Sequence, residues 1–177
     1  MRKLIGGLAV VAVLLSLPGL ADAQRRAATR RQAAPQPVSF GVQASFGSDT
    51  DFGIGGRVVF GLQSLFPTTP LDAHVGFDYF FPDAPAGVDV TYWEINGNVA
   101  YRIPNVRSSL APYVGGGLNI AHASAASGGV SASDTKVGLN LLGGTTFGTR
   151  SKVKPFAEAR VILGGGEQFV ITGGVRF

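Results

Sequence analysis

The chain has 177 residues, enough for one domain, and carries a formal net charge of +4. Charged residues make up 15% of the chain and its mean hydropathy is +0.25, which is more apolar than a typical soluble domain. The absence of cysteine excludes disulfide bonds, thiol chemistry and any cysteine-based metal site.

The N-terminal part divides into an apolar leader and a basic segment. Residues 1–23 are predicted to be a secretory signal peptide, because a basic start precedes a short apolar run and a small-x-small cleavage site that ends at Ala23. The apolar run is short for a retained membrane anchor. Residues 24–37 contain four arginines and no acid, which predicts a disordered basic lead-in.

From Val38 onward apolar and polar residues alternate with a period of two, which predicts β-strands rather than helices. Eight strands are predicted, at about 38–47, 52–63, 71–81, 90–103, 111–122, 135–147, 154–163 and 169–177. Short stretches rich in Gly, Pro, Ser and Asp separate most of them. The stretches 82–88 and 123–134 are predicted to be loops, and the second consists almost wholly of small residues.

The charged side chains inside the predicted strands share one face. That face alternates with one that carries almost only Val, Ile, Leu, Phe, Ala and Gly. The polar set comprises Arg57, Asp72, His74, Asp78, Glu94, Arg102, Lys136, Glu158, Arg160 and Arg176. Bases and acids are nearly balanced, so we expect them to pair, because an unpaired buried charge is costly. Glu158 is expected to pair with Arg176 rather than with Lys136.

Three predicted strands carry aromatic residues spaced by eight on the apolar face. These pairs are Phe52 and Phe60, Trp93 and Tyr101, and Phe169 and Phe177. At ~3.3 Å per residue and a tilt of about 40°, eight residues cover roughly 20 Å along a membrane normal, close to the height of an apolar band between aromatic girdles. The pattern therefore predicts an all-β fold, a closed antiparallel eight-stranded up-and-down transmembrane β-barrel over residues 38–177.

The last predicted strand ends in alternating apolar residues, with Phe169, Ile171, Val175 and Phe177 on one face. This stretch resembles the C-terminal assembly signal of bacterial outer-membrane β-barrels. The span 38–177 resembles the small eight-stranded outer-membrane barrels of the OmpA transmembrane-domain and OmpX type. The resemblance implies a monomer in the outer membrane, in contact with its lipid and lipopolysaccharide, and recognised by the barrel assembly machinery through the last strand.

A barrel of this size has an interior that side chains can fill. We therefore expect a plugged lumen and a structural or interaction role in the cell envelope, without catalysis, with a narrow pore as one alternative. No cofactor or metal is expected, and no glycine-rich nucleotide-binding motif follows a strand. An exported protein gives no reason to expect a nucleic-acid partner. The predicted outer loops are short, which disfavours an adhesin or receptor.

His122 and Ser124 suggest a second alternative. They lie two residues apart on the lipid-facing side of a strand end, which resembles the His-x-Ser pair of outer-membrane lipid A deacylases, where the His activates a Ser nucleophile. The Asn that follows the Ser in that family is Ala125 here, and Glu158 points inward by parity. A lipid A-modifying hydrolase is thus an alternative hypothesis, and the preferred interpretation is an interfacial His beside a small-residue loop.

Overall fold

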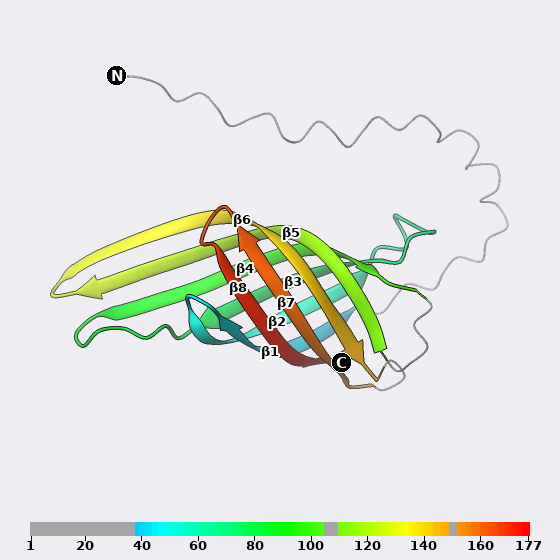
Figure 1. Cartoon of the computed structure of the whole chain (residues 1–177), viewed down its shortest axis with the longest axis horizontal. Coiled ribbons are helices and arrows are strands. Elements are labelled where there is room, and N and C mark those ends of the chain that lie inside the picture. The colour runs from blue at the N-terminus through cyan, green and yellow to red at the C-terminus, as the bar shows by residue number, and fades with distance from the viewer. Residues whose placement is uncertain (1–37, 105–109, 149–151) are drawn as a thin grey trace, which may run out of the picture. The chain divides into compact units, whose positions relative to one another are not determined.

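The computed structural model describes residues 38–104, 110–148 and 152–177, so the predicted signal peptide (1–23) and lead-in (24–37) lie outside the described residues. The strands are β1 (Ser39–Gly47), β2 (Asp51–Gly61), β3 (Leu71–Phe80), β4 (Asp89–Arg102), β5 (Leu110–Ser127), β6 (Val130–Phe147), β7 (Lys154–Leu163) and β8 (Gln168–Arg176). Each pairs antiparallel with the next and β8 pairs with β1, which confirms the predicted closed eight-stranded barrel (Figure 1). No helix in the described ranges is long and apolar enough to cross a membrane.

The two ends of the barrel are distinct. At one end β1 begins and β8 finishes, and there the Phe177 N–H donates to the Phe40 carbonyl oxygen at 2.9 Å. We call this the terminal end. The opposite end carries the turn between β5 and β6, and we call it the hairpin end (Figure 1).

The β5–β6 hairpin differs from the prediction. Residues 123–134, expected to form a loop, continue both strands until Ser127 pairs with Val130. Gly128 and Gly129 join them with φ angles of 58° and 83°, and positive φ at both central positions is what a two-residue type I′ turn requires. The loop prediction was wrong because this Ser- and Ala-rich stretch shows no alternation of apolar and polar residues. Its backbone nevertheless forms regular strand pairs.

This hairpin projects beyond the rest of the barrel wall. β7 pairs with β6 only as far as Leu139, so the hairpin-end part of β6 has no strand on that side. Figure 1 shows the hairpin and the β3–β4 loop reaching well past the β1–β2 and β7–β8 turns. The hairpin end therefore offers more surface than the short loops predicted from sequence.

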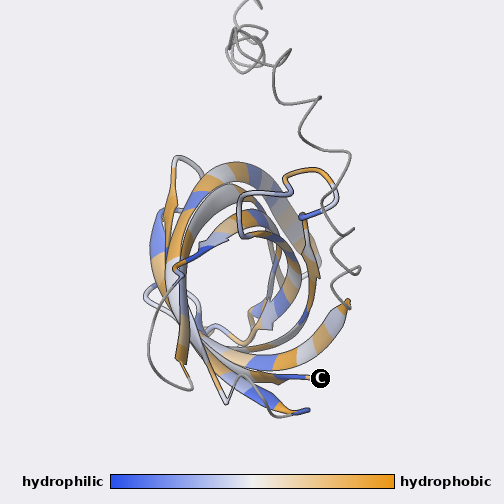
Figure 2. Cartoon of the chain, turned by 90° about the vertical axis from the view of Figure 1, so that its right-hand side faces the viewer, coloured by the Kyte–Doolittle hydropathy of each residue, from blue (hydrophilic) through white to orange (hydrophobic). Residues whose placement is uncertain are grey.

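The outward-facing side chains of the wall are apolar and exposed. Ile54, Leu141 and Ile171 are each at least half exposed, while their neighbours along the same strands are mostly buried. Figure 2 shows this as hydrophobic and hydrophilic residues alternating along the ribbons. A soluble monomer rarely exposes apolar surface of this extent, whereas the hydrocarbon of a bilayer is its natural contact.

Aromatic side chains gather towards both ends of this apolar surface. At the terminal end they are Phe40, Phe60, Tyr101, Phe147 and Phe177, and at the hairpin end they are Phe46, Phe52, Phe81, Trp93 and Phe169. Each of the three pairs spaced by eight residues places one ring in each group. Two such belts flank the apolar band of transmembrane barrels.

The apolar wall makes a direct prediction. Leu141→Arg places a charge on the wall near its middle and should lower the free energy of unfolding from lipid vesicles by about 2–4 kcal/mol. Ser133→Arg lies on the same face of β6 but on the projecting hairpin, and should change it by less than ~0.5 kcal/mol. Urea titration in vesicles measures the free energy of unfolding of both variants. Equal losses of stability in the two variants would place the wall outside the hydrocarbon.

Candidate functional site in the barrel interior

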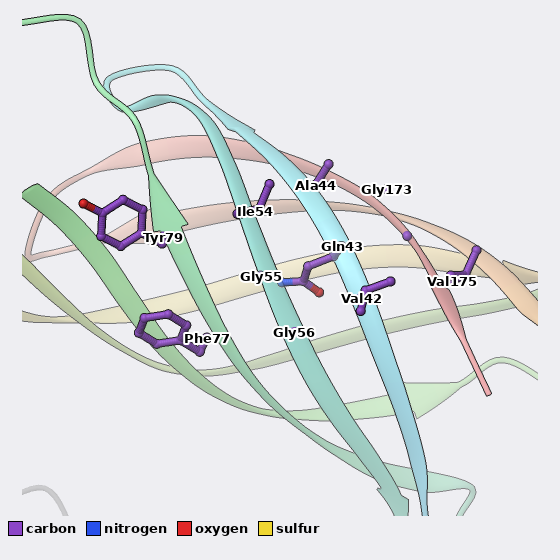
Figure 3. A pocket seen from close by; sticks show the side chains of 11 residues that line it. Val42, Gln43, Ala44, Ile54, Gly55, Gly56, Phe77, Tyr79, Gly173 and Val175 are labelled. Atoms are coloured by element: carbon purple, nitrogen blue, oxygen red, sulfur yellow. The ribbon is translucent and has the colours of Figure 1, made fainter.

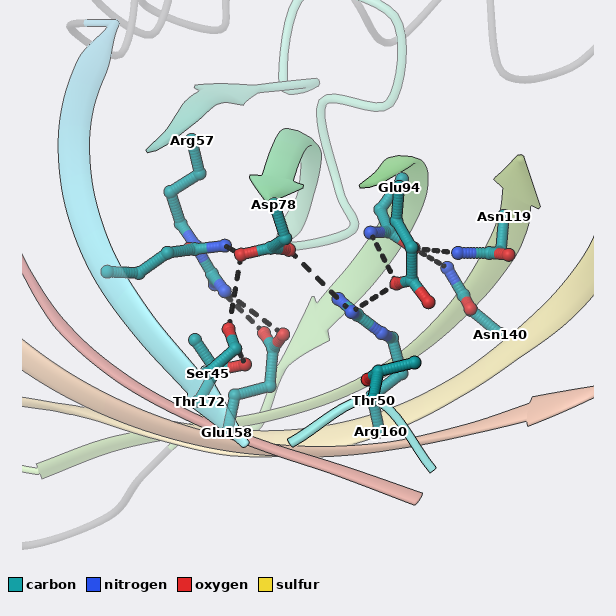
Figure 4. A network of polar contacts seen from close by, with 12 residues as sticks. Ser45, Thr50, Arg57, Asp78, Glu94, Asn119, Asn140, Glu158, Arg160 and Thr172 are labelled. Carbon is teal, nitrogen blue, oxygen red and sulfur yellow. Dashed lines mark hydrogen bonds and ion pairs between the residues drawn. The ribbon is translucent and has the colours of Figure 1, made fainter. Parts of the chain in front are cut away.

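The interior of the barrel is filled by polar side chains from alternate positions of all eight strands. The fully or nearly fully buried members are Gln43, Ser45, Arg57, His74, Asp78, Glu94, Asn96, Asn98, Asn119, Asn140, Thr146, Glu158, Arg160, Gln168 and Thr172. Such a set is stable away from water only if its charges and hydrogen-bonding groups meet partners. The contacts among them are the candidate site (Figure 4).

Arg57 and Glu158 form a bidentate ion pair across the interior. Arg57 Nη1 donates to Glu158 Oε2 at 3.0 Å and Nη2 donates to Oε1 at 3.1 Å. The Tyr113 hydroxyl donates to the same carboxylate at 2.9 Å, and the Arg57 guanidinium lies 4.1 Å above the centre of the Phe156 ring. Two parallel charge-assisted bonds fix both partners in one geometry, which joins β2 to β7, two strands that are not neighbours.

Arg160 forms a second centre with two acids. Its Nη2 lies 3.1 Å from Glu94 Oε2 and 3.7 Å from Asp78 Oδ2. Glu94 also accepts hydrogen bonds from the Tyr92 hydroxyl at 3.0 Å and from the Gln168 side chain. One arginine thus connects β7 to β3 and β4 on the opposite wall.

Gln43 connects the two centres. Its amide oxygen accepts a bond from Arg57 Nε, and its Nε2 donates to Asp78 Oδ1 at 2.6 Å. The Ser45 hydroxyl donates to the same Asp78 oxygen at 3.1 Å. Hydrogen bonds and the ion pair between Arg160 and Asp78 therefore join the two centres into one connected group of charged side chains.

An asparagine cluster fills the interior beside β4, β5 and β6. Asn119 and Asn140 each donate to Asn96 Oδ1 at 2.9 Å, and Asn140 also donates to Asn98 Oδ1 at 2.9 Å. The network predicted from the sequence contained only ionisable residues, so this cluster was not predicted. Four asparagines at inward-facing positions of adjacent strands were the available signal.

Apolar side chains also enter the interior near both ends. Phe80, Ile162 and Val170 pack together near the hairpin end, with Tyr92 against them. Near the terminal end Ala100, Tyr113 and Leu142 form a second cluster. These residues fall on the face predicted to be polar, and they narrow the interior on either side of the charged groups.

A small cavity lies among the charged groups. Its volume is about 10 Å³, and its lining includes Arg57, His74, Asn98, Glu158 and Arg160. That is close to the minimum for a single water molecule. The contacts and this volume describe an interior that is packed with side chains at its centre.

The remaining predicted site residues occupy different surroundings. Arg102 and Asp72 form an ion pair at 3.0 Å near the terminal end, where both are partly exposed. Arg176 donates to Thr146. The described residues contain no cluster of three or more His, Asp or Glu side chains that could hold a metal ion.

Two expectations about the charged set are corrected. Lys136 is exposed, and its Nζ lies 3.7 Å from Asp134 Oδ2. Both residues belong to the first part of β6, which lies on the projecting hairpin and not in the barrel wall. Glu158 pairs with Arg57 and not with Arg176. Sequence reasoning considered only neighbouring strands, whereas long side chains in a narrow barrel reach the opposite wall.

His122 and Ser124 lie on the outward side of β5. His122 Nδ1 is 2.8 Å from the Thr135 hydroxyl, and its ring stacks on Trp93 with 5.0 Å between centroids. No hydrogen bond joins His122 to Ser124 within the described part of the chain, and no described acid bonds to His122. A catalytic Ser–His pair needs a His that contacts the Ser and is oriented by a third group. The contacts of His122 are instead with the Thr135 hydroxyl and the Trp93 ring.

The predicted assembly-signal residues lie on or beside β8. Phe169 and Ile171 face outward, and Phe177 is exposed at the terminal end. Val175 is partly covered and pairs with Val42 of β1.

No model of a known protein family matches the chain, and no curated protein is significantly similar to it. Solved structures do resemble it. Neisserial surface protein A shares 21% identity over 78% of this chain and 94% of its own, with a TM-score of 0.56. The N-terminal β-barrel domain of Pseudomonas aeruginosa OprF shares 15% identity over 78% and 97%, with a TM-score of 0.58. A major outer membrane protein from Thermus thermophilus shares 14% over 80% and 99%, with a TM-score of 0.51.

These likenesses confirm the predicted fold, which is that of the small eight-stranded outer-membrane β-barrels. At identities between 14 and 21% they concern the fold alone. The chemistry of the interior must therefore be tested on its own residues.

The ion pair across the interior gives a second prediction. Glu158→Ala leaves Arg57 buried without its partner and should lower the free energy of unfolding by about 3–5 kcal/mol. Ala159→Val, on the outward face of the same strand, should change it by less than ~0.5 kcal/mol. Urea unfolding in vesicles measures both values.

A double-mutant cycle identifies the partner of Glu158. Arg57→Ala combined with Glu158→Ala should give a coupling energy above about 1 kcal/mol, and Arg176→Ala combined with Glu158→Ala a smaller one. A larger coupling with Arg176 would mean that the Arg57 pair does not form in the folded barrel.

Proposed function

We propose that this protein spans the bacterial outer membrane as a plugged β-barrel and serves a structural or interaction role in the cell envelope, without catalysis. The observation that carries the proposal is the inverted distribution of polarity, with an apolar outer wall and an ion-paired interior. The hydrocarbon of a bilayer matches such an outer wall. The contacts between side chains inside the barrel favour a rigid, closed lumen over one through which ions pass.

In this proposal the terminal end faces the periplasm and the hairpin end faces outward. The projecting β5–β6 hairpin and the β3–β4 loop are then the surfaces available for an external partner. Membrane lipid and lipopolysaccharide contact the wall, and β8 with its outward Phe169 and Ile171 is the segment that the barrel assembly machinery would recognise. We propose a monomer, since the barrel closes without a strand from a second copy.

Fractionation tests the proposed location. The protein should float with outer-membrane vesicles and migrate differently on a gel before and after heating, because a closed barrel resists detergent until it is heated. Recovery as a soluble periplasmic protein whose migration does not change on heating would overturn the proposal.

A narrow pore is the first alternative, and the contacts of Arg57 and Arg160 argue against it. Both bridge opposite walls, and the cavity between them is about as small as one water molecule. Purified protein in planar bilayers should therefore give no steady conductance, while a wide porin in the same bilayers gives clear steps. A steady, ion-selective current from this protein would contradict the plugged lumen.

A lipid A hydrolase that uses Ser124 and His122 is the second alternative. Because His122 is held by Thr135 and Trp93, we expect Ser124→Ala to have no effect on lipid A. Mass spectrometry of lipid A from cells that express the wild type or this variant provides the measurement. An acyl chain that is absent with the wild type and restored with the variant would establish the enzyme.

A further inference from the structure

Two outward-facing glycines hollow the lipid-facing wall. Gly56 of β2 pairs with Val42 of β1, and Gly173 of β8 pairs with Ala44 of β1. Because neither glycine has a side chain and Ala44 has only a methyl group, a groove of about 670 Å³ opens across β8, β1, β2 and β3. Figure 3 shows its lining from these four strands.

Nothing described within the chain requires glycine at these two positions. Neither has a positive φ. A Cβ at Gly173 would meet nothing within 4 Å, and one at Gly56 would meet only a carbonyl oxygen at 3.4 Å. The inward-facing Gly174 differs, since a Cβ there would lie 2.7 Å from the Phe156 ring. Glycine inside a strand weakens it and often marks the close approach of a ligand or another backbone.

The shape and chemistry of the groove favour a flexible apolar chain. Val42, Ile54 and Phe77 stand on its sides and are 56%, 50% and 46% exposed. A single hydrocarbon chain can lie between such protruding side chains, whereas the convex wall of a second barrel would touch only their tips. The groove is also continuous with the apolar wall that the transmembrane fold presents to lipid.

One end of the groove carries a polar group. Tyr79 lies near the hairpin end of β3, 5.1 Å from the Phe81 ring. The Tyr79 hydroxyl has no hydrogen-bond partner within the described residues, so it can donate to an oxygen of a lipid headgroup or acyl linkage. The other end, at Val175, lies towards the terminal end of β8. A lipid in this groove would therefore have its polar part at the hairpin end.

We propose that the groove binds one acyl chain of lipid A, with Tyr79 beside its polar part. The choice of lipid A rests on the proposed function, which turns the hairpin end towards the outer leaflet. The two glycines then provide space for a bound lipid and are not merely tolerated in the wall.

Filling the groove tests this proposal. The Gly56→Leu/Gly173→Leu variant adds two side chains that face the lipid, and the Cβ atoms that carry them meet no atom closer than 3.4 Å. Gly97→Leu is the matched control, because Gly97 also faces outward, lies outside the groove, and a Cβ there would meet nothing within 4 Å. All three proteins are reconstituted in phosphatidylcholine vesicles that contain lipid A, extracted in mild detergent and examined by native mass spectrometry.

The wild type and the Gly97→Leu control should each retain one lipid A, and the double variant should retain at least tenfold less. Equal retention by all three proteins, retention of phosphatidylcholine instead of lipid A, or a dimer that only the double variant loses would each overturn the proposal. Vesicle flotation separates this result from the proposed function. A wild type that floats but retains no lipid A refutes only the groove, whereas one that does not float refutes the membrane location.

Discussion

Hydrocarbon offers no hydrogen bonds, so every backbone N–H and C=O inside a bilayer must find its partner within the protein. The pairing of β8 with β1 meets this constraint, because it leaves no open edge along the wall. Closure with eight strands fixes the rest of the arrangement. Side chains must point alternately to lipid and to a narrow interior, and the sequence from Val38 onward supplies that alternation.

The same closure explains why the interior is polar and yet filled. Alternate positions of all eight strands converge on one narrow space, where long side chains meet those of the opposite wall. Arg57 and Arg160 use this proximity to bridge strands that are far apart around the barrel. Glycine at inward positions such as Gly174 leaves room for the Phe156 ring, on which Arg57 rests. The position of the Arg57 charge therefore depends on how the Phe156 ring packs inside the barrel.

The period of two was sufficient to predict the strands, since it is a property of each strand alone, and the aromatic pairs spaced by eight residues indicated the membrane barrel. It also indicated the inward direction of Glu158, Arg160 and Glu94. It could not identify the partner of Glu158, because that depends on which side chains face each other across the interior. The β5–β6 hairpin was missed for a different reason. Its strands extend beyond the lipid-facing wall, so their sequence does not alternate between apolar and polar residues. The groove at Gly56 and Gly173 arises from side chains of four strands and has no signal in any one of them.

The Arg57–Glu158 pair also bears on how the barrel forms and comes apart. The two residues are 101 positions apart in the chain and their strands are not neighbours in the wall, so we expect their contact to form late, when the sheet has curled into a barrel. We therefore expect the bond to be largely absent from the transition state for folding. An interaction that is absent from the transition state slows unfolding and leaves the folding rate nearly unchanged. On this expectation, the pair prolongs the lifetime of a finished barrel more than it speeds the assembly of a new one.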